Sequence, residues 1–408
     1  MSSRELDVVV LGASGFTGQL VMEYLAQAYG VGESLNWAIA GRSQARLEAA
    51  RDSCLTPEQA RELPLLLADS NDPDSLAAMA ARTRVVCTTV GPYARYGTPV
   101  VAACAAAGTH YCDLAGEVQW ITRVISEYEQ VAVDSGARIV HCCGFDSVPS
   151  DMGTWYLQQL MHERHGVYAT HVKGRVGANR GAASGGTIAS ILNMLEEAGK
   201  EPEVRRQVAD PYALYPSGVA RGLDGQDQRG AVFDTDFDQW TSPFVMAAIN
   251  TRVVRRSNAL LGFPWGEDFR YDESTLNRSR AQAAGVSLAT GAGMLTLAFG
   301  PTRKRAARFL PKPGDGPDRS QRESGFYELF FHGIAPDNRE HDMRIKVRGD
   351  LDPGYGSTSR MLGEAAVCLA QDSLAVTGGF WTPASALGQA YLDRLQTRAD
   401  ITFTPVDI

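Results

Sequence analysis

The chain has 408 residues, 44% of them hydrophobic and 21% charged, which is enough apolar material for a large core in roughly two or three domains. Its formal net charge of -8 argues against a nucleic acid as partner, because a phosphate-binding surface usually needs a basic excess. The seven cysteines form no C-x-x-C pair, so we expect reduced, buried thiols and no metal site. The first ten residues hold no long apolar run, so we expect no secretory signal and a cytoplasmic protein.

The first 145 residues alternate between short apolar runs and helix-like patterns. Runs typical of strands lie at 7–11, 37–41, 63–69, 84–91, 109–115 and 137–143. Helical patterns lie at 16–28, 43–54, 72–83, 98–108 and 118–135. Strands that alternate with helices over short loops pair in parallel, and strands that are apolar throughout indicate a sheet covered on both faces. We therefore predict an α/β fold with a Rossmann-type doubly wound parallel sheet over residues 1–148.

The strict alternation ends after residue 148, and the elements that follow are those of an α+β region. Helices are predicted at 150–164 and 185–200, and strands at 168–177, 325–335 and 341–351. The last two strands form an antiparallel pair, which a short polar turn joins. Residues 201–240 are polar with scattered proline and glycine, and we interpret them as a loop. Residues 149–352 thus make a second domain for substrate binding, and we expect the antiparallel pair to build the sheet of a homodimer.

The C-terminal part of the chain returns to helix. An amphipathic pattern at 357–374 and a second one at 385–396 predict two helices. Residues 353–408, which hold these helices and a final strand, are expected to pack back on the first domain.

Residues 283–300 contain no charged side chain, and a basic stretch follows them at 301–312. As one helix they would span roughly 27 Å, just short of a bilayer core, and their four glycines weaken the case for a true span. We predict a segment that is buried or interfacial within the protein. The alternatives are a transmembrane span and contact with a membrane surface through 283–310, which would make the protein peripheral at the membrane.

The sequence GASGFTG, residues 12–18, follows the first apolar strand and opens the first helix. Gly12 lets the chain turn off the strand, Gly15 lets the backbone approach a pyrophosphate, and Gly18 lets the helix pack on the sheet. The amide groups that favour a phosphate here belong to Ser14, Gly15, Phe16 and Thr17. A glycine triplet in this context predicts a dinucleotide site.

The end of the second predicted strand distinguishes the two nicotinamide cofactors. NAD sites carry Asp or Glu there for the ribose 2′-hydroxyl, whereas this chain has Arg42 and Ser43 in the sequence AGRS. Because arginine binds phosphate through a planar fork of donors, we predict NADP(H), with these two residues at its 2′-phosphate. Asp69 ends the third strand and is predicted to bind the adenine, with a role as a helix cap as the alternative.

Further motifs accompany the glycine turn along the chain. They are TTVGPYARYGTPVVAACAAAGTHYCDLAGE (88–117), CGFDSVPSDMG (143–153), GGTIAS (185–190), NALLGFPWGEDFRYDE (258–273) and GDLDPGYGSTSRMLGEAAVCLA (349–370). Together with GASGFTG and AGRS, they resemble the saccharopine dehydrogenase-like oxidoreductases, and among these the trans-acting enoyl reductases of bacterial lipid and polyketide assembly. The resemblance spans nearly the whole chain.

The resemblance implies NADP-dependent hydride chemistry and, in the trans-acting group, reduction of the C=C bond of a small-molecule or carrier-bound acyl substrate. The fourth strand of this fold points at the nicotinamide half of the cofactor, so Val90, Gly91 and Pro92 are expected to contact it. Two alternatives stay open: a saccharopine- or imine-type amino-acid oxidoreductase, and an NADP-binding sensor or scaffold without turnover. We identify no cluster dedicated to a charged amino-diacid, which favours an apolar substrate.

Enoyl reduction needs a proton donor as well as the hydride. Open α/β sheets place ligands at the loops after their strands, and the late loops carry the catalytic candidates Tyr93, Asp113 and Asp146. Each has a structural alternative: Tyr93 would pack on the nicotinamide, and the two carboxylates would cap the helices that follow them. Glu117 and His141 lie in the same region and have similar alternatives.

Overall fold

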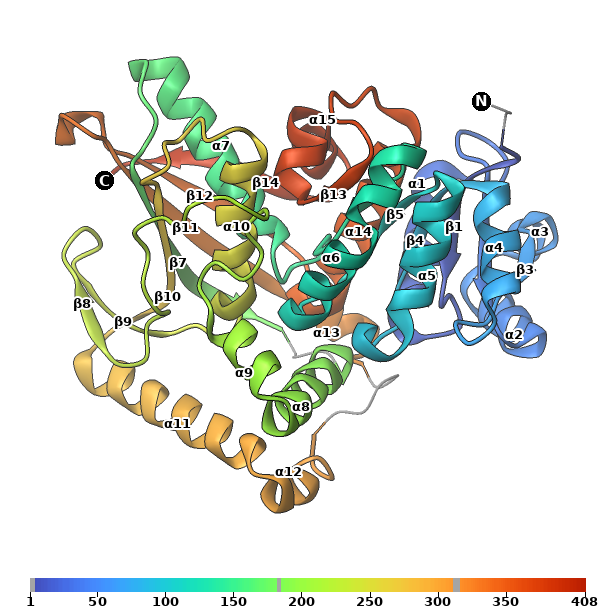
Figure 1. Cartoon of the computed structure of the whole chain (residues 1–408), viewed down its shortest axis with the longest axis horizontal. Helices are drawn as coiled ribbons and strands as arrows, with labels where there is room; N and C mark the ends of the chain where they lie inside the picture. The colour runs from blue at the N-terminus through green and yellow to red at the C-terminus, as the bar shows by residue number, and fades with distance from the viewer. Residues whose placement is uncertain (1–3, 182–184, 311–315) are drawn as a thin grey trace.

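The computed structural model describes residues 4–181, 185–310 and 316–408. Two seven-stranded sheets form the centres of its two halves, and helices cover them and lie between them (Figure 1). The predicted combination of a Rossmann-type domain with a second α+β domain is confirmed.

The first sheet is parallel throughout, as the alternation of strands and helices predicts. Its strands in spatial order are β13 (Gly379–Trp381), β6 (Arg138–Val140), β5 (His110–Cys112), β4 (Thr83–Thr88), β1 (Leu6–Leu11), β2 (Trp37–Gly41) and β3 (Leu65–Leu67). The helices around it are α1 (Phe16–Tyr29), α2 (Gln44–Cys54), α3 (Pro57–Glu62), α4 (Pro73–Arg82), α5 (Tyr93–Ala107), α6 (Val118–Ser135) and α14 (Thr358–Gln371).

Strand β1 shows why the strands of this sheet are apolar along their whole length. Val8 and Val10 belong to one core, which they share with residues of α1 and α14, while Val9 and Leu11 belong to a second core with residues of α4 and α5. Successive strand residues point to opposite faces, so a sheet covered on both sides needs apolar residues at every position.

The second sheet is mixed. Its strands in spatial order are β14 (Ile401–Val406), β12 (Met343–Gly349), β11 (Phe326–Ile334), β7 (His171–Arg180), β10 (Arg270–Asn277), β9 (Gln239–Pro243) and β8 (Val232–Asp234). Only β7 and β10 pair in parallel. The helices of this half are α7 (Val148–His165), α8 (Gly185–Lys200), α9 (Pro202–Ala209), α10 (Ala247–Leu260), α11 (Arg280–Ala298), α12 (Gly300–Ala306), α13 (Arg319–Glu323) and α15 (Pro383–Thr397).

The predicted antiparallel pair is present as β11 and β12, with Phe330 opposite Lys346. Both strands are interior, however, because β7 takes the other side of β11 and β14 takes the other side of β12. The hydrogen-bonding edges that a dimer sheet would need are therefore occupied within the chain. The expectation that this pair joins a homodimer sheet is wrong.

The C-terminal segment is divided between the two halves. Helix α14 packs on β1, β4 and β5, and β13 adds a parallel strand to the edge of the first sheet. The last strand, β14, was expected to pack on the first domain but pairs with β12 of the second sheet instead. A strand with an alternating pattern can pair with the edge of either sheet, so its own residues do not specify which strand it joins.

The prediction of a loop over 201–240 is wrong at three places, because α9, β8 and the first residues of β9 fall within it. These elements have three to eight residues and exposed side chains, so hydrophobic periodicity gives little signal for them.

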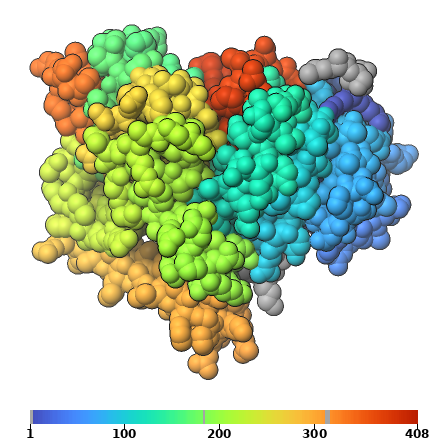
Figure 2. Space-filling model, viewed as in Figure 1, coloured from blue at the N-terminus to red at the C-terminus, as the bar shows by residue number. Residues whose placement is uncertain are grey.

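Residues 283–300 were predicted to be buried or interfacial within the protein, and the prediction of burial is wrong. Of the residues in α11, only Ala283 is buried, although the helix runs beside β9, β10 and α8. Figure 2 shows α11 and α12 along one border of the molecule. The seven cysteines are free, as expected, and six are buried while Cys54 is half-buried.

Candidate active site

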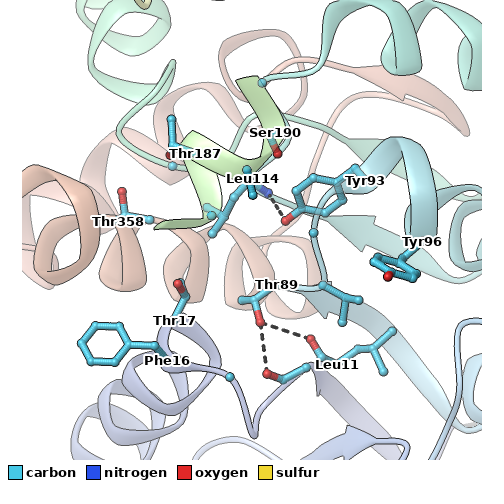
Figure 3. A pocket seen from close by; sticks show the side chains of 18 of the residues that line it. Leu11, Phe16, Thr17, Thr89, Tyr93, Tyr96, Leu114, Thr187, Ser190 and Thr358 are labelled. Atoms are coloured by element: carbon cyan, nitrogen blue, oxygen red, sulfur yellow. Dashed lines mark hydrogen bonds between the residues drawn. The ribbon is translucent and has the colours of Figure 1, made fainter. Parts of the chain in front are cut away.

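A pocket of about 550 Å³ lies at the carboxyl edge of the first sheet. The loops that follow β1 to β6 form one wall, and α8 together with the π-helix η2 (Pro353–Ser357) forms the other (Figure 3). Parallel strands end at the same edge of a sheet, so residues far apart in the sequence meet in this cavity. Its volume is in the usual range for a ligand site.

The glycine turn makes the close backbone contacts that a dinucleotide site requires. Gly12 has a φ of +91°, and its amide donates to the Ala40 carbonyl at 2.9 Å. A Cβ on Gly18 would lie 2.3 Å from the Gly12 carbonyl oxygen, so only glycine lets α1 come this close to the loop. Of the predicted turn residues, Gly18 stays behind the pocket wall, and those that line the pocket are Gly12, Ser14, Gly15, Phe16 and Thr17.

The start of α1 is suited to an anion. Gly15 is its N-cap, no side chain caps the helix, and no acidic residue lies in the first turn. The first amide groups and the positive end of the helix dipole are therefore available for a phosphate.

Two arginines lie beyond the end of β2. Arg42 and Arg46 both line the pocket. Arg46 was missed by the sequence analysis, although a second arginine four residues later, in the first turn of a helix, returns to the same side. Ser43 is the N-cap of α2 and does not line the pocket. The uncapped helix and the arginine pair fit the pyrophosphate and 2′-phosphate of NADP(H).

Most, but not all, of the residues predicted to contact the adenine and the nicotinamide half of the cofactor line the pocket. Asp69 lines it, but its Oδ1 already accepts from the backbone and side-chain nitrogens of Asn71 at 3.0 and 3.1 Å. The N-cap role predicted as the alternative for this loop belongs to Asp72, which caps α4, and not to Asp69 itself. Val90 and Gly91 line the pocket, whereas Pro92 is the N-cap of α5 and does not.

Thr89, which the sequence analysis missed, ties the loop after β4 to the glycine turn. Its hydroxyl lies 3.4 Å from the Leu11 carbonyl oxygen and 3.3 Å from that of Gly12 (Figure 3). It lines the pocket. It lies within the 88–117 motif, but the motif does not show its role, because that role depends on a contact across two strands.

Tyr93 borders the pocket, but both hydrogen-bonding capacities of its hydroxyl are used. The hydroxyl donates to the Thr88 carbonyl at 3.1 Å and accepts from the Leu114 amide at 3.1 Å (Figure 3). Burial and the nearby Asp113 raise the pKa of this phenol well above its ordinary value. Tyr93 thus joins β4 to the loop after β5, and we do not assign proton donation to it.

Asp113 is fully buried and does not line the pocket. Its Oδ2 accepts from the Tyr111 hydroxyl at 2.9 Å and lies 2.7 Å from His141 Nδ1. Its Oδ1 accepts the amides of Ala115 and Cys142 at 3.0 and 3.1 Å. The Asp113 carboxylate therefore has a structural role outside the pocket, and His141 is one of its four partners.

Glu117 lines the pocket and caps a helix other than the expected one. Its two oxygens accept the amides of Tyr93 and Ala94 at 2.7 and 3.0 Å, so the carboxylate caps α5 and not α6. Oε1 also accepts the hydroxyl of Ser190, from α8, at 2.7 Å. Burial raises the pKa of this carboxyl, while the three hydrogen bonds oppose the rise.

Asp146 is the predicted acid that remains available in the pocket. The residue is half-buried and lines the cavity, and its carboxyl makes no hydrogen bond or ion pair with any residue of the described ranges. The helix α7 begins after Ser147 without a side-chain cap, so the capping alternative for Asp146 is wrong. Burial raises the pKa of Asp146 to about 6, which makes it an acid able to donate a proton near neutral pH.

Comparison with known proteins gives consistent results. Residues 8–140 match the saccharopine dehydrogenase NADP-binding domain. A candidate trans-acting enoyl reductase of Mycobacterium tuberculosis (strain ATCC 25618 / H37Rv) is 43% identical over 408 residues, which cover 96% of each chain. The trans-acting enoyl reductase of Mycobacterium ulcerans (strain Agy99) is 39% identical over 411 residues, or 97% of this chain and 96% of the relative. This chain belongs to the trans-acting enoyl reductase family.

The matched domain makes this family member an NADP-dependent oxidoreductase, as predicted. Its fold is similar to that of saccharopine dehydrogenase (L-Glu forming) from Saccharomyces cerevisiae, with a TM-score of 0.53, 13% identity, and coverage of 98% of this chain and 100% of the other. At this identity the likeness concerns the fold alone. Of the three catalytic candidates of this enoyl reductase family member, only Asp146 lines the pocket with a side chain that no described residue hydrogen-bonds.

Proposed function

We propose that this chain reduces the C=C bond of a carrier-bound enoyl thioester with NADPH, in the assembly of lipid- or polyketide-type acyl chains, and that Asp146 gives the proton. The observation that carries the proposal is Asp146, which lines the pocket, has a carboxyl without a hydrogen-bond partner among the described residues, and has a pKa raised to about 6. The names of the relatives at 43% and 39% identity support the same chemistry.

The order of strands supports a nicotinamide end of the cofactor and an acyl substrate that both lie near Asp146. In the first sheet, β2 and β6 lie on opposite sides of β1. The arginines after β2 suit the adenosine end of the cofactor, so the nicotinamide end would extend toward β4 and beyond, to the side where Asp146 follows β6. The acid would then lie near the reacting bond.

The rest of this side of the pocket is suited to an apolar chain. Apolar side chains from three separate segments line it: Leu114, Ile191, Met194 and Met246. Among the described residues, the cations that line the cavity are Arg42 and Arg46, and both follow β2, at the other end from Asp146. This distribution favours an acyl substrate over a charged amino-diacid.

Bound NADPH would supply a hydride to the carbon β to the thioester carbonyl. The electrons of the C=C bond then pass to the carbonyl oxygen as an enolate, and the α-carbon takes the proton of Asp146 as the carbonyl reforms. Asp146 is left as a carboxylate and regains a proton from water. Gly186 and Thr187 bring the positive end of α8 to the pocket, which favours the developing oxyanion.

The proposed reaction is tested with purified protein, NADPH and an enoyl thioester beside an imine of an amino acid. We expect NADPH oxidation with the thioester only, and a saturated acyl product by mass spectrometry. Turnover of the imine alone would establish the saccharopine-type alternative. Tight NADPH binding with turnover of neither class would favour the sensor or scaffold.

We further propose that this protein is cytoplasmic and peripheral at a membrane, which it contacts through residues 283–310. No single helix in the described part of the chain has the length and apolar character of a membrane span, and α11 and α12 meet at an angle of 108°. Leu288, Leu295 and Phe299 are 75%, 74% and 64% exposed. The basic residues of α12 follow directly: Arg303, Lys304 and Arg305. An exposed apolar helix beside a basic cluster fits the surface of an anionic bilayer.

The membrane proposal predicts that changing both Leu288 and Leu295 to glutamate lowers partition onto anionic vesicles by at least about tenfold, because charges replace two leucines that would be buried in the bilayer. The measurement is co-sedimentation with vesicles containing phosphatidylserine. Ile408→Glu is the matched control, since Ile408 is similarly exposed at 64% but lies at the C-terminal end. Equal binding of wild type and the double variant would contradict the proposal.

A further inference from the structure

Helix α8 is held in place in an unusual way for a helix that borders a pocket. Of its residues, only Gly185 and Asn193 are buried, so it lacks the buried apolar stripe that normally fixes a helix. It crosses above Leu114 and Tyr93 of the cofactor-binding half (Figure 3). It packs beside α9 and α11, and polar contacts connect it to the first domain.

Those contacts come from three polar residues, Ser190, Asn193 and Glu197, which we call the α8 polar row. Their spacing of three and four residues places them on one face of the helix. Each bonds to the first domain: Ser190 to Glu117 at 2.7 Å, Asn193 Oδ1 to Arg95 Nε at 2.7 Å, and Glu197 to Gln119 Nε2 at 3.2 Å. Arg123 adds an ion pair to Glu197 at 4.0 Å.

The row is also connected along the helix. Asn193 Nδ2 donates to Glu197 Oε1 at 2.8 Å, so its amide bonds to Arg95 through one atom and to Glu197 through the other. Three of these contacts involve a charged group, and such hydrogen bonds are stronger than neutral ones. The row thus couples α8 to α5, α6 and the loop before α6.

The apolar residues of α8 point elsewhere. Ile191 and Met194, which follow two members of the row directly, line the pocket and are only half-buried. An apolar chain in the pocket would cover them and complete the packing of the helix. The same helix therefore bonds to the first domain by polar groups and offers apolar side chains to a ligand.

We propose that the α8 polar row consists of positioning residues, which hold α8 at the distance from the first domain that the acyl chain of the substrate requires. The proposal rests on the proposed function for the identity of the ligand. Loss of a bond in the row lets α8 move away, so the apolar wall contacts the chain less well. The row is then expected to affect the KM of the acyl substrate and not the hydride or proton transfer.

The test uses the full-length protein and two matched pairs of variants. Ser190→Ala removes a hydroxyl of the row, and Ser190→Thr retains it. Glu197→Ala removes a carboxylate of the row, whereas Glu196→Ala removes the neighbouring carboxylate, which pairs with Lys200 of the same helix. Alanine is the best helix former, so the three alanine changes do not weaken α8 through propensity, and threonine differs only slightly from serine.

Amide hydrogen exchange of the segment 185–200 is measured first, without substrate. We expect exchange to rise about tenfold in Ser190→Ala and Glu197→Ala, the effect of losing one hydrogen bond to a charged group, and to stay near wild type in the two control variants. Unchanged exchange in both row variants would overturn the proposal whatever the enzyme does with enoyl thioesters.

Kinetics with the enoyl thioester then test the positioning role. We expect KM to rise about tenfold in both row variants while kcat and NADPH affinity remain close to wild type, with recovery in Ser190→Thr. Faster exchange with an unchanged KM would overturn the positioning role. If wild type turns over no enoyl thioester, the proposed function fails, and the exchange data alone decide whether the row holds α8.

Discussion

Replacing Asp146 with asparagine is expected to lower kcat for enoyl reduction by about 10²–10⁴-fold, because the amide has no acidic proton for the α-carbon of the substrate. NADPH affinity is expected to be retained, since the carboxyl follows β6 and the phosphate-binding groups follow β1 and β2. Steady-state kinetics with the enoyl thioester and a fluorescence titration with NADPH measure the two quantities. An unchanged kcat would exclude Asp146 as the proton donor.

The pH dependence of the wild-type enzyme provides a second test of Asp146. The folded-state pKa is about 6, above the ordinary value of 3.8, so the acid form required for donation is lost as pH rises through 6. We expect kcat/KM to fall about tenfold per pH unit above that value. The fall should be absent from the residual activity of Asp146→Asn.

The melting temperature of variants distinguishes a catalytic role of Asp146 from a structural one. Burial disfavours the charged form of Asp146 in the folded protein, so above pH 6 the ionised carboxylate opposes folding. Asp146→Asn is thus expected to have a Tm equal to or above that of wild type at pH 8. Asp113→Asn is the contrasting variant and is expected to lower Tm, because its NH₂ group would replace an oxygen that accepts hydrogen bonds, either from the amides of Ala115 and Cys142 or from the Tyr111 hydroxyl.

Changing Arg42 to alanine is expected to weaken NADPH binding by about 10–100-fold and to leave NADH binding nearly unchanged, since a charge-assisted contact to the 2′-phosphate is lost. The double variant with Arg46→Ala is expected to bind the two cofactors with similar affinity. Isothermal titration with each cofactor measures both values. The selectivity ratio is the informative quantity, because it cancels any general effect on the fold.

Arg51 offers a matched control for the arginine pair. It lies on α2, the helix that also carries Arg46, and pairs with Asp52 outside the pocket. Arg51→Ala is expected to leave the affinity for both cofactors intact. An equal loss of NADPH and NADH affinity in Arg42→Ala would show that the residue does not read the 2′-phosphate.

The cofactor half of the site was predictable because its signals are local. The residues of the turn from Gly12 to Gly18 are consecutive, and Arg42 lies at the end of one strand. Their contacts, such as the Gly18 approach to the Gly12 carbonyl, form within a few residues of the chain. Arg46 was missed because the rule for the 2′-phosphate concerns the end of the second strand, whereas Arg46 lies in the first turn of α2.

Local sequence signals did not predict which of the three candidates is the proposed proton donor. Tyr93, Asp113 and Asp146 all follow strands of the first sheet, and the sequence treats them alike. The structure distinguishes them by partners that lie far away in the chain: the Leu114 amide for Tyr93, and His141 with the Cys142 amide for Asp113. Asp146 is the one that lines the pocket with a carboxyl that no described residue binds.

The sequence by itself determined the Rossmann-type sheet, the choice of NADP(H) and the family, because strand and helix periodicities and contiguous motifs are properties of neighbouring residues. Only the tertiary structure decided where the apolar helix α11 is exposed, which sheet β14 joins, and that α8 faces the cofactor-binding half. The physical reason is the same in each case. Burial and pairing depend on which surface another part of the chain covers, and the residues of that surface are dozens to hundreds of positions away.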